Sequence, residues 1–300
     1  MATEAVRFGI QVPQDAPFDE LRERWRMCEQ LGFDVIHVAD HMGDPRDLHG
    51  VWHDGWTTLT AMATSTTRIR VGILASNPIL HHPAVLAKAA SSVDVLSGGR
   101  LELGLGCGIA AFDHAATGTP YWGARERVQR FSEFVEVVDR WLRAGDEPVR
   151  HCGQHYRSDG VPVVPAPVQQ PRPTIIIAGQ SPTVLRTAAR HGDVWNTHGP
   201  FGADLDEIAA RTRQQNSALD QLCESAGRDP SSLRRSLLLI ESRLAPTSGL
   251  DAWANSDWFE RIVTRFVETG IREFIAFWPQ PHHMEHFEHA AGLLPELRAG

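Results

Sequence analysis

The dipeptide Asp40-His41 offers the best acid–base chemistry in the sequence. It directly follows residues 35–39, whose apolar, branched side chains predict a short buried strand. A histidine titrates near neutrality and can exchange a proton with a substrate or hydrogen-bond a developing charge. The alternative is a histidine that only caps a loop, and the residues themselves leave both interpretations open. Because neighbours in a chain need not touch, the sequence predicts no hydrogen bond between these two side chains.

A second candidate site is the glycine-rich exit of another expected strand. Gly104, Gly106 and Gly108 alternate there, and bare backbone N–H groups can closely approach an anion or a flat ring. A purely structural interpretation, in which the glycines only make tight turns, is equally acceptable on spacing alone. The full GxGxxG spacing is absent and the cluster follows the fourth strand, so we discount a Rossmann dinucleotide site.

The histidines near the C-terminus resemble a metal cluster only at first sight. His282 and His286 share one helical face, as do His286 and His289, whereas His283 lies apart. No acid or cysteine completes a ligand set around them. We therefore expect surface or lid histidines and no metal site.

The elements that would position these residues alternate regularly along the chain. Eight expected strands and eight expected helices predict a single α/β domain over residues 1–300, a (β/α)8 TIM barrel with its site at the C-terminal strand ends. A doubly wound sheet, which more often has five to seven strands, is the alternative. Residues 145–173, between strands 4 and 5, form a non-repeat excursion rich in proline and glycine, with short strands. The expected strands are residues 6–12, 35–39, 69–74, 101–105, 174–178, 193–196, 236–241 and 273–278, and the expected helices are 18–31, 56–66, 83–96, 124–143, 182–191, 205–226, 258–269 and 284–298.

Composition narrows the class of partner. The net charge of −8 over 300 residues argues against nucleic acid, whose partners usually carry a basic stripe. No run of about 18 apolar residues is present, and the first residues contain no basic-then-apolar leader, so we expect no membrane association and a cytoplasmic location. The four cysteines form no CxxC pair, which supports neither a zinc site nor a disulfide framework.

Several segments resemble the bacterial luciferase-like superfamily, in particular the branch that uses the deazaflavin coenzyme F420. The resemblance runs from about residue 6 to residue 279 and is strongest in the central motif at 82–108. It implies the TIM barrel independently of the periodicity. The matching motifs are GFDVIHVADH (32–41), RIRVG (68–72), HPAVLAKAASSVDVLSGGRLELGLGCG (82–108), TIIIAGQSPTVLRTAARHGDVWN (174–196) and TGIREFIAFWP (269–279).

The resemblance implies roles at matching positions. Asp40 and His41 fall beside the deazaflavin ring, with His41 as the catalytic residue. Leu74 and Ala75 fall where the family has a non-proline cis peptide that forms a bulge behind the ring. A helix begins after the fifth strand, and its N-terminal N–H groups suit a phosphate. The further cofactor-binding positions are Ser76, Asn77, Gly106, Cys107, Gly108, Gly179, Gln180, Ser181 and Thr183.

One position departs from the family pattern. Ile109 stands where the sugar-phosphate dehydrogenase branch has a catalytic glutamate, and an aliphatic side chain cannot exchange a proton. Oxidation of glucose 6-phosphate by that mechanism is therefore not expected. The substrate side, residues 112–123, 195–201 and 278–283, predicts a mostly apolar, aromatic pocket for a small molecule.

Three classes of function remain. The first is an F420-dependent oxidoreductase that transfers a hydride between the deazaflavin and a small organic substrate, working as a homodimer with a separate cofactor reductase. The second is an FMN-dependent monooxygenase of the same fold, and the third is a non-catalytic member. The compact length favours the first class, and the intact glycines at the fourth and fifth strand exits argue against the third.

Overall fold

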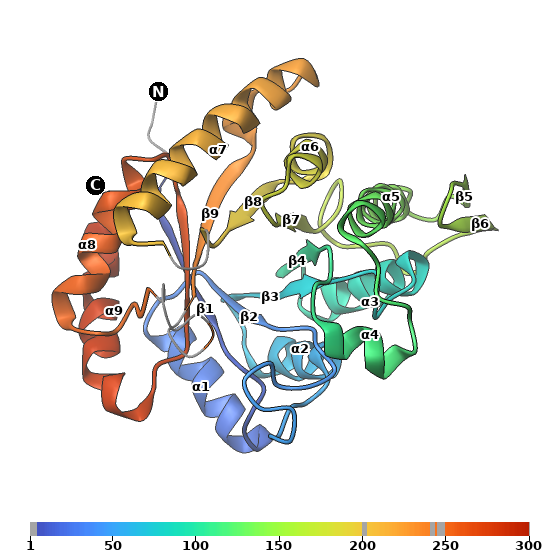
Figure 1. The fold of residues 1–300 in the computed structure, drawn as a ribbon. Coiled ribbons are helices and arrows are strands. Elements are labelled where there is room, and N and C mark those ends of the chain that lie inside the picture. Colours follow the sequence, from blue (N-terminus) through green and yellow to red (C-terminus); the bar gives the residue numbers. More distant parts are fainter. Residues whose placement is uncertain (1–4, 200–202, 241–243, 245–249, 300) are drawn as a thin grey trace.

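The computed structural model describes residues 5–199, 203–240, 244 and 250–299. Eight parallel strands close into a barrel in the order β1-β10-β9-β8-β7-β4-β3-β2, which confirms the predicted (β/α)8 fold (Figure 1). Closure is made by β1 and β10, with Arg7 opposite Glu273. The barrel strands are β1 (Arg7–Gln11), β2 (Val35–Val38), β3 (Arg70–Ser76), β4 (Leu101–Gly106), β7 (Thr174–Ala178), β8 (Val194–Thr197), β9 (Arg234–Leu239) and β10 (Glu273–Phe277).

Helices surround the barrel, and their starts follow local capping signals. Pro83 occupies the first turn of α3, where its missing N–H costs nothing, and His82 caps that helix. Asp204 and Glu207 form a capping box at the start of α7. All eight expected helices are present within a few residues of their predicted ends. They are α1 (Phe18–Gln30), α2 (Gly55–Ser65), α3 (Pro83–Leu96), α5 (Ala124–Arg143), α6 (Pro182–His191), α7 (Leu205–Ser225), α8 (Ser256–Val267) and α9 (Met284–Ala299), with short 3-10 turns η1 (Pro230–Ser232) and η2 (Pro281–His283).

Two regions add to the predicted pattern. A short helix, α4 (Ala111–Thr117), forms where only a loop was expected. The excursion contains an antiparallel pair, β5 (Val149–Cys152) and β6 (Arg157–Val161), which lies outside α5 (Figure 1). Its later part packs on α3, because the Asp94 carboxylate accepts the backbone N–H groups of Val168 and Gln169 at 2.7 and 3.0 Å. The expected seventh strand extends to residue 241, which lies outside the described residues.

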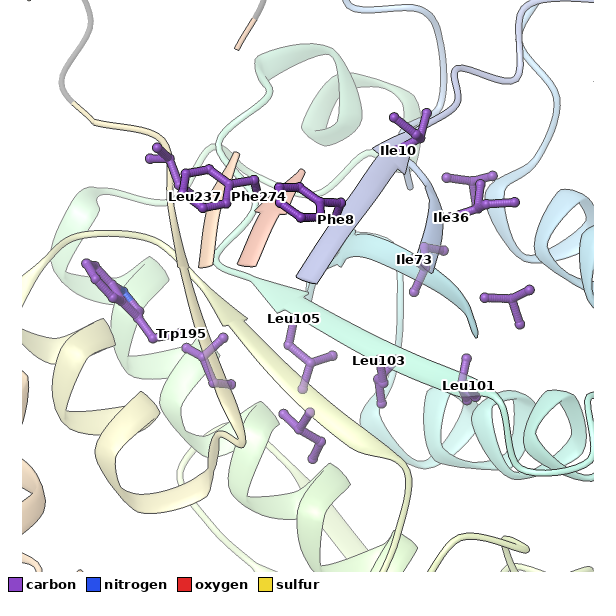
Figure 2. Close-up of a cluster of buried hydrophobic side chains, with 14 of the residues drawn as sticks. Phe8, Ile10, Ile36, Ile73, Leu101, Leu103, Leu105, Trp195, Leu237 and Phe274 are labelled. Atoms are coloured by element: carbon purple, nitrogen blue, oxygen red, sulfur yellow. The ribbon is translucent and has the colours of Figure 1, made fainter. Parts of the chain in front are cut away.

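An apolar layer between strands and helices forms the core. Strand residues that point outward supply it, including Phe8, Ile36, Leu103 and Phe274 (Figure 2). The Phe8 ring is fully buried, with its centroid 6.0 Å from Phe274 and 5.8 Å from Phe259 of α8. Burial of such side chains is the main favourable contribution to folding.

Charged arginine and glutamate side chains, rather than apolar ones, fill the N-terminal end of the barrel. Arg7 bonds Glu102 and Glu273 at 2.8 Å each, and Arg70 bonds Glu102 at 2.6 Å. Burial acts to raise the pKa of Glu102, but the two guanidinium groups outweigh it and lower that pKa to about 2. For Glu273, burial and the nearby Glu102 charge raise the pKa despite Arg7. We call Arg7, Arg70, Glu102, Glu273 and Arg234, which lies 3.5 Å from Glu273, the ionic layer.

No helix within the described residues is long and apolar enough to cross a membrane.

Candidate functional site

Asp40, two residues after the end of β2, joins three neighbouring elements at the C-terminal mouth of the barrel. It is buried, and its Oδ2 accepts hydrogen bonds from His81 Nε2 at 2.7 Å and from the Ser76 hydroxyl. The Ser76 oxygen in turn accepts the Trp56 indole N–H at 3.1 Å. Because the carboxylate is the acceptor, the His81 proton in this bond lies on Nε2. Asp40 thus fixes the end of β3, the loop before α3 and the start of α2.

His41 is paired with a different carboxylate. Its Nδ1 lies 2.7 Å from Oδ2 of Asp113, a fully buried residue of α4. The other Asp113 oxygen accepts the backbone N–H of Met42 at 2.9 Å. The His41 side chain remains 28% exposed, with its ring 5.6 Å from the Phe112 ring. With Nδ1 directed at the carboxylate, Nε2 carries the lone pair that can take a proton.

Strand β3 bulges at the position predicted for the ring wall. The Leu74–Ala75 peptide is cis, as predicted, and the pairing of β3 with β4 shifts register between Ile73 and Ser76. A Cβ on Gly104 would lie 2.4 Å from the Ile73 carbonyl oxygen. Gly104 is therefore required by the close approach of the two strands, which agrees with the structural interpretation of that glycine.

The loops after β3 and β4 meet across Asn77. Its side chain is buried, and its Oδ1 accepts the backbone N–H of Ile79 at 3.0 Å. Gly108 has a positive φ of 69°, and a Cβ there would lie 2.9 Å from the same Asn77 oxygen. A Cβ on Gly106 would lie 3.3 Å from that of Ala75. Glycine thus lets these two loops pack together, and the Asn77 carbonyl is used within the loop.

The guanidinium group of Arg127 lies near Cys107, at the exit of β4. Burial raises the pKa of Cys107 to about 12, although the nearby Arg127 charge opposes this shift. The thiol is therefore neutral at physiological pH and not a nucleophile. Arg127, at the end of the first turn of α5, also approaches the Tyr121 hydroxyl at 3.5 Å. The sequence analysis did not single out Arg127, which can attract an anionic group to this exit.

The loop between β7 and α6 uses its polar side chains to shape a helix start. Ser181 is the N-cap of α6 and accepts the Val184 N–H at 3.4 Å. Gln180 Nε2 donates to the Gly199 carbonyl at 2.9 Å, and Arg186 donates to Thr183 Oγ1 at 2.8 Å. What remains for a ligand in the first turn is the Thr183 backbone N–H, because Pro182 has none and Ser181 accepts that of Val184, with Arg186 as a nearby cation. Gly179 adopts a φ of 134° just before this turn.

A cavity of about 330 Å³ opens beside the ends of β9 and β10. Its walls include the apolar side chains of Leu239, Trp253, Phe277 and Trp278, and the polar side of the cavity includes His283. Burial, followed by the neighbouring His282, lowers the pKa of His283 and favours the neutral imidazole. This lining agrees with the aromatic character expected of residues 278–283, whereas residues 200 and 201 of the expected substrate side lie outside the described part.

The described ranges contain no group of three or more His, Cys, Asp or Glu residues arranged to hold a metal ion.

The predicted site positions fall on four adjacent barrel strands. Asp40 contacts Ser76, Ala75 faces Gly106, and Gly106 pairs with Ala178 immediately before the β7–α6 loop. The sequence analysis missed His81, which bonds Asp40 in addition to Ser76, and Asp113, which bonds His41. His81 could have been noticed as a polar residue after the third strand, whereas Asp113 lies on the helix that was not predicted.

Comparison with known proteins identifies a family and its relatives. The family model described as luciferase-like monooxygenase matches residues 3–290. The chain is 32% identical over 216 residues to the F420-dependent hydroxymycolic acid dehydrogenase of Mycobacterium tuberculosis, covering 72% of this chain and 56% of that protein. It is 31% identical over 227 residues to the F420-dependent glucose-6-phosphate dehydrogenase of Intrasporangium calvum, covering 70% of this chain and 66% of that protein. The chain thus spans about half to two-thirds of the length of these relatives.

A solved structure, an F420-dependent secondary alcohol dehydrogenase in complex with an F420-acetone adduct, superimposes with a TM-score of 0.81. The superposition covers 98% of this chain and 99% of that one at 18% sequence identity. At this identity the likeness concerns the fold.

Proposed function

The chain belongs to the luciferase-like monooxygenase family, and on that basis we propose that it is an oxidoreductase that transfers a hydride between the deazaflavin coenzyme F420 and a small organic substrate. The observation that carries this proposal is His41, held at the barrel mouth with its Nε2 lone pair available, beside strand exits walled by glycine and neutral side chains. The relatives named as F420-dependent dehydrogenases support F420 as the cofactor.

The side chains present fit a flat ring that carries an anionic extension. Gly106 and Gly108 keep side chains away from the exit of β4, so that this neutral loop packs closely against the bulge at Ala75 and against Asn77. When bound, F420 accepts or donates a hydride and reacts only slowly with oxygen. We assign the ring wall to Asp40, Leu74, Ala75, Ser76, Asn77, Gly106, Cys107 and Gly108, and the phosphate side to Gly179, Gln180, Ser181 and Thr183 at the start of α6.

His41 holds or moves the proton that accompanies hydride transfer. Its Nε2 accepts a proton when a substrate hydroxyl is oxidised, and the protonated ring returns that proton in the reverse direction. Asp40 has a different role, because its carboxylate is bonded to His81 and Ser76. It shapes the loops around the ring rather than exchanging the proton.

Titration with each cofactor tests this proposal. Absorbance and fluorescence titrations of the protein should give a lower dissociation constant for F420 than for FMN, and turnover should proceed without oxygen. Tight FMN binding with an oxygen-dependent product would identify an FMN monooxygenase instead. Binding of neither cofactor would indicate a non-catalytic member of the family.

Substitution of His41 tests its part in the chemistry. His41→Ala should lower kcat by about 10²–10⁴-fold, the range for a lost acid–base group, while F420 remains bound. His49→Ala is the matched control, because His49 is exposed in the same loop and uses only its backbone N–H in the bond to Asp47. Equal turnover of the two variants would return His41 to the role of a loop cap.

The expected homodimer uses the outer faces of α2 and α3. Helix α2 contains no charged residue, and α3 exposes Val85 and Leu96 beside a single lysine, Lys88. Such uncharged surface is typical of subunit interfaces. Light scattering of the wild-type protein should give the mass of a dimer, and Thr64→Glu together with Val85→Glu should give a monomer. A wild-type monomer at micromolar concentration would remove this part of the proposal.

The proposal includes a cytoplasmic enzyme supplied with reduced cofactor by a separate reductase. The free thiols of Cys28, Cys107, Cys152 and Cys223 suit a reducing compartment. Cell fractionation tests the location. Addition of an F420 reductase to a multiple-turnover assay tests the supply of cofactor, and turnover unchanged by the reductase would contradict it.

A further inference from the structure

Asp113 contacts His41 and its neighbour at two points. One carboxylate oxygen bonds the His41 ring at Nδ1, 2.7 Å away, and the other accepts the Met42 backbone N–H at 2.9 Å. The carboxylate is fully buried, so water does not compete for either bond. These two bonds fix the orientation of the imidazole ring together with the path of the loop that carries it.

Helix α4 holds Asp113 in place through the next residue, His114. The His114 ring is buried, with its centroid 4.9 Å from Tyr121 and 5.2 Å from Trp122. The Arg130 guanidinium covers the same Trp122 ring at 4.6 Å. In the described part of the chain, neither ring nitrogen of His114 has a hydrogen-bond partner. Packing of aromatic rings against the start of α5 therefore anchors α4, and the carboxylate of Asp113 with it.

We propose that Asp113 is the positioning residue of the acid–base step, keeping the proton of His41 on Nδ1 so that Nε2 presents its lone pair to the substrate. This inference rests on the proposed function of His41. Asp113 itself does not reach the substrate, because it is fully buried and both its oxygens are occupied. Asp40 cannot replace it, since the Asp40 carboxylate is bonded to His81 and Ser76.

The two bonds make a specific prediction for Asp113→Asn. The Met42 N–H requires an acceptor, so it takes the single carbonyl oxygen of the new amide. The amide NH₂ then faces His41 and donates to Nδ1, which must lose its proton. The imidazole switches to the tautomer with its proton on Nε2, and the lone pair that receives the substrate proton is lost.

Two measurements on the same variant test this reasoning. Nitrogen-15 NMR of cofactor-free protein should show His41 protonated on Nδ1 in the wild type and on Nε2 in Asp113→Asn. In steady-state assays, kcat should fall by about 10²-fold or more, as expected when a residue that orients a catalytic histidine is neutralised. The KM and the dissociation constant for F420 should stay within about twofold, because no contact to substrate or cofactor is removed.

The outcomes distinguish a failure of the role proposed for Asp113 from a failure of the proposed function. Since the tautomer is read without cofactor, it tests Asp113 even if the enzyme proves to use FMN. An unchanged tautomer, or a wild-type kcat in Asp113→Asn, would overturn the positioning role. A change in the near-UV circular dichroism spectrum, to which the buried aromatic rings contribute, would reveal a structural effect. Asp113→Glu, which keeps both acceptor oxygens, should then restore the tautomer. A folded Asp113→Glu protein with its proton on Nε2 would also overturn the proposal.

Discussion

The ionic layer at the N-terminal end of the barrel contains two carboxylates whose replacement by glutamine should change stability by very different amounts. Glu102 and Glu273 are both fully buried, and each bonds Arg7 at 2.8 Å. Glu102 has a second close cation, Arg70 at 2.6 Å, whereas the second cation of Glu273 is 3.5 Å away. A comparison of Glu102→Gln with Glu273→Gln therefore changes the charge and keeps the shape and the depth of burial.

The expected loss of stability for each variant follows from the pKa of the carboxylate that it replaces. The difference between an ordinary pKa of 4.5 and about 2 for Glu102 corresponds to about 3 kcal/mol in favour of the charged form. This contribution is present above pH 4.5 and is lost as the pH falls through about 2. Breaking such a buried pair costs about 3–5 kcal/mol, so Glu102→Gln should lower the melting temperature by about 6–10 °C.

For Glu273 the pKa is shifted in the opposite direction. Burial and the Glu102 charge raise its pKa, so the protein disfavours the negative charge at this position. A neutral glutamine still accepts the Arg7 hydrogen bond and removes the repulsion from Glu102. We expect Glu273→Gln to change the free energy of unfolding by less than about 1 kcal/mol.

Urea unfolding and thermal melting at pH 7 measure both variants. The gap between them should persist in about 0.5 M salt, because buried charges are screened little. Equal losses, or a larger loss for Glu273→Gln, would show that the two carboxylates share the same environment and refute the argument.

Three further predictions concern other buried positions. Burial lowers the pKa of His37 to about 4, so the unfolded chain binds its proton first as the pH falls. The free energy of unfolding should drop by about 3 kcal/mol between pH 6.5 and 4, and a urea series should find a shallower drop in His37→Gln; an equal slope would contradict this. Gly104→Ala would place a methyl group 2.4 Å from a carbonyl oxygen and should lower the free energy of unfolding by about 1–3 kcal/mol. Gly123→Ala, with nothing within 4 Å of its Cβ, should be neutral when both variants are compared by thermal melting. With a pKa of about 12, only about 10⁻⁴ of the Cys107 thiol is ionised at pH 8. Iodoacetamide should therefore modify the exposed Cys152 before Cys107, as followed by peptide mass spectrometry, and the reverse order would refute this.

The barrel could be predicted because each strand and helix carries its own signal. Strands buried on both faces give short branched apolar runs, and helices such as α5 show a stripe at helical spacing. Helix α4 gives no such signal, since seven residues are too few for a period to be recognised. The pairing of β5 with β6 within the excursion likewise depends on contacts rather than on a local pattern.

The candidate site was predictable in its positions but not in its pairings. Asp40 and His41 follow from the strand exit and the family motif, and the cis peptide at Leu74–Ala75 follows from the resemblance. The histidine that bonds Asp40 is 41 residues away in the chain, and the carboxylate that bonds His41 is 72 residues away. Which carboxylate meets which imidazole depends on the loop paths after β2, β3 and β4, and no spacing in one sequence encodes those paths.

The side chains that hydrogen-bond around Asp40 and His41 all come from one contiguous stretch of chain. Asp40, Ser76, His81 and Asp113 contact one another or His41 without help from the second half of the barrel. The aromatic cavity beside β9 and β10 is encoded more than 100 residues later in the gene. A crossover between related genes near Gly123, where α5 begins, would therefore exchange this cavity and leave the hydrogen bonds around Asp40 and His41 intact.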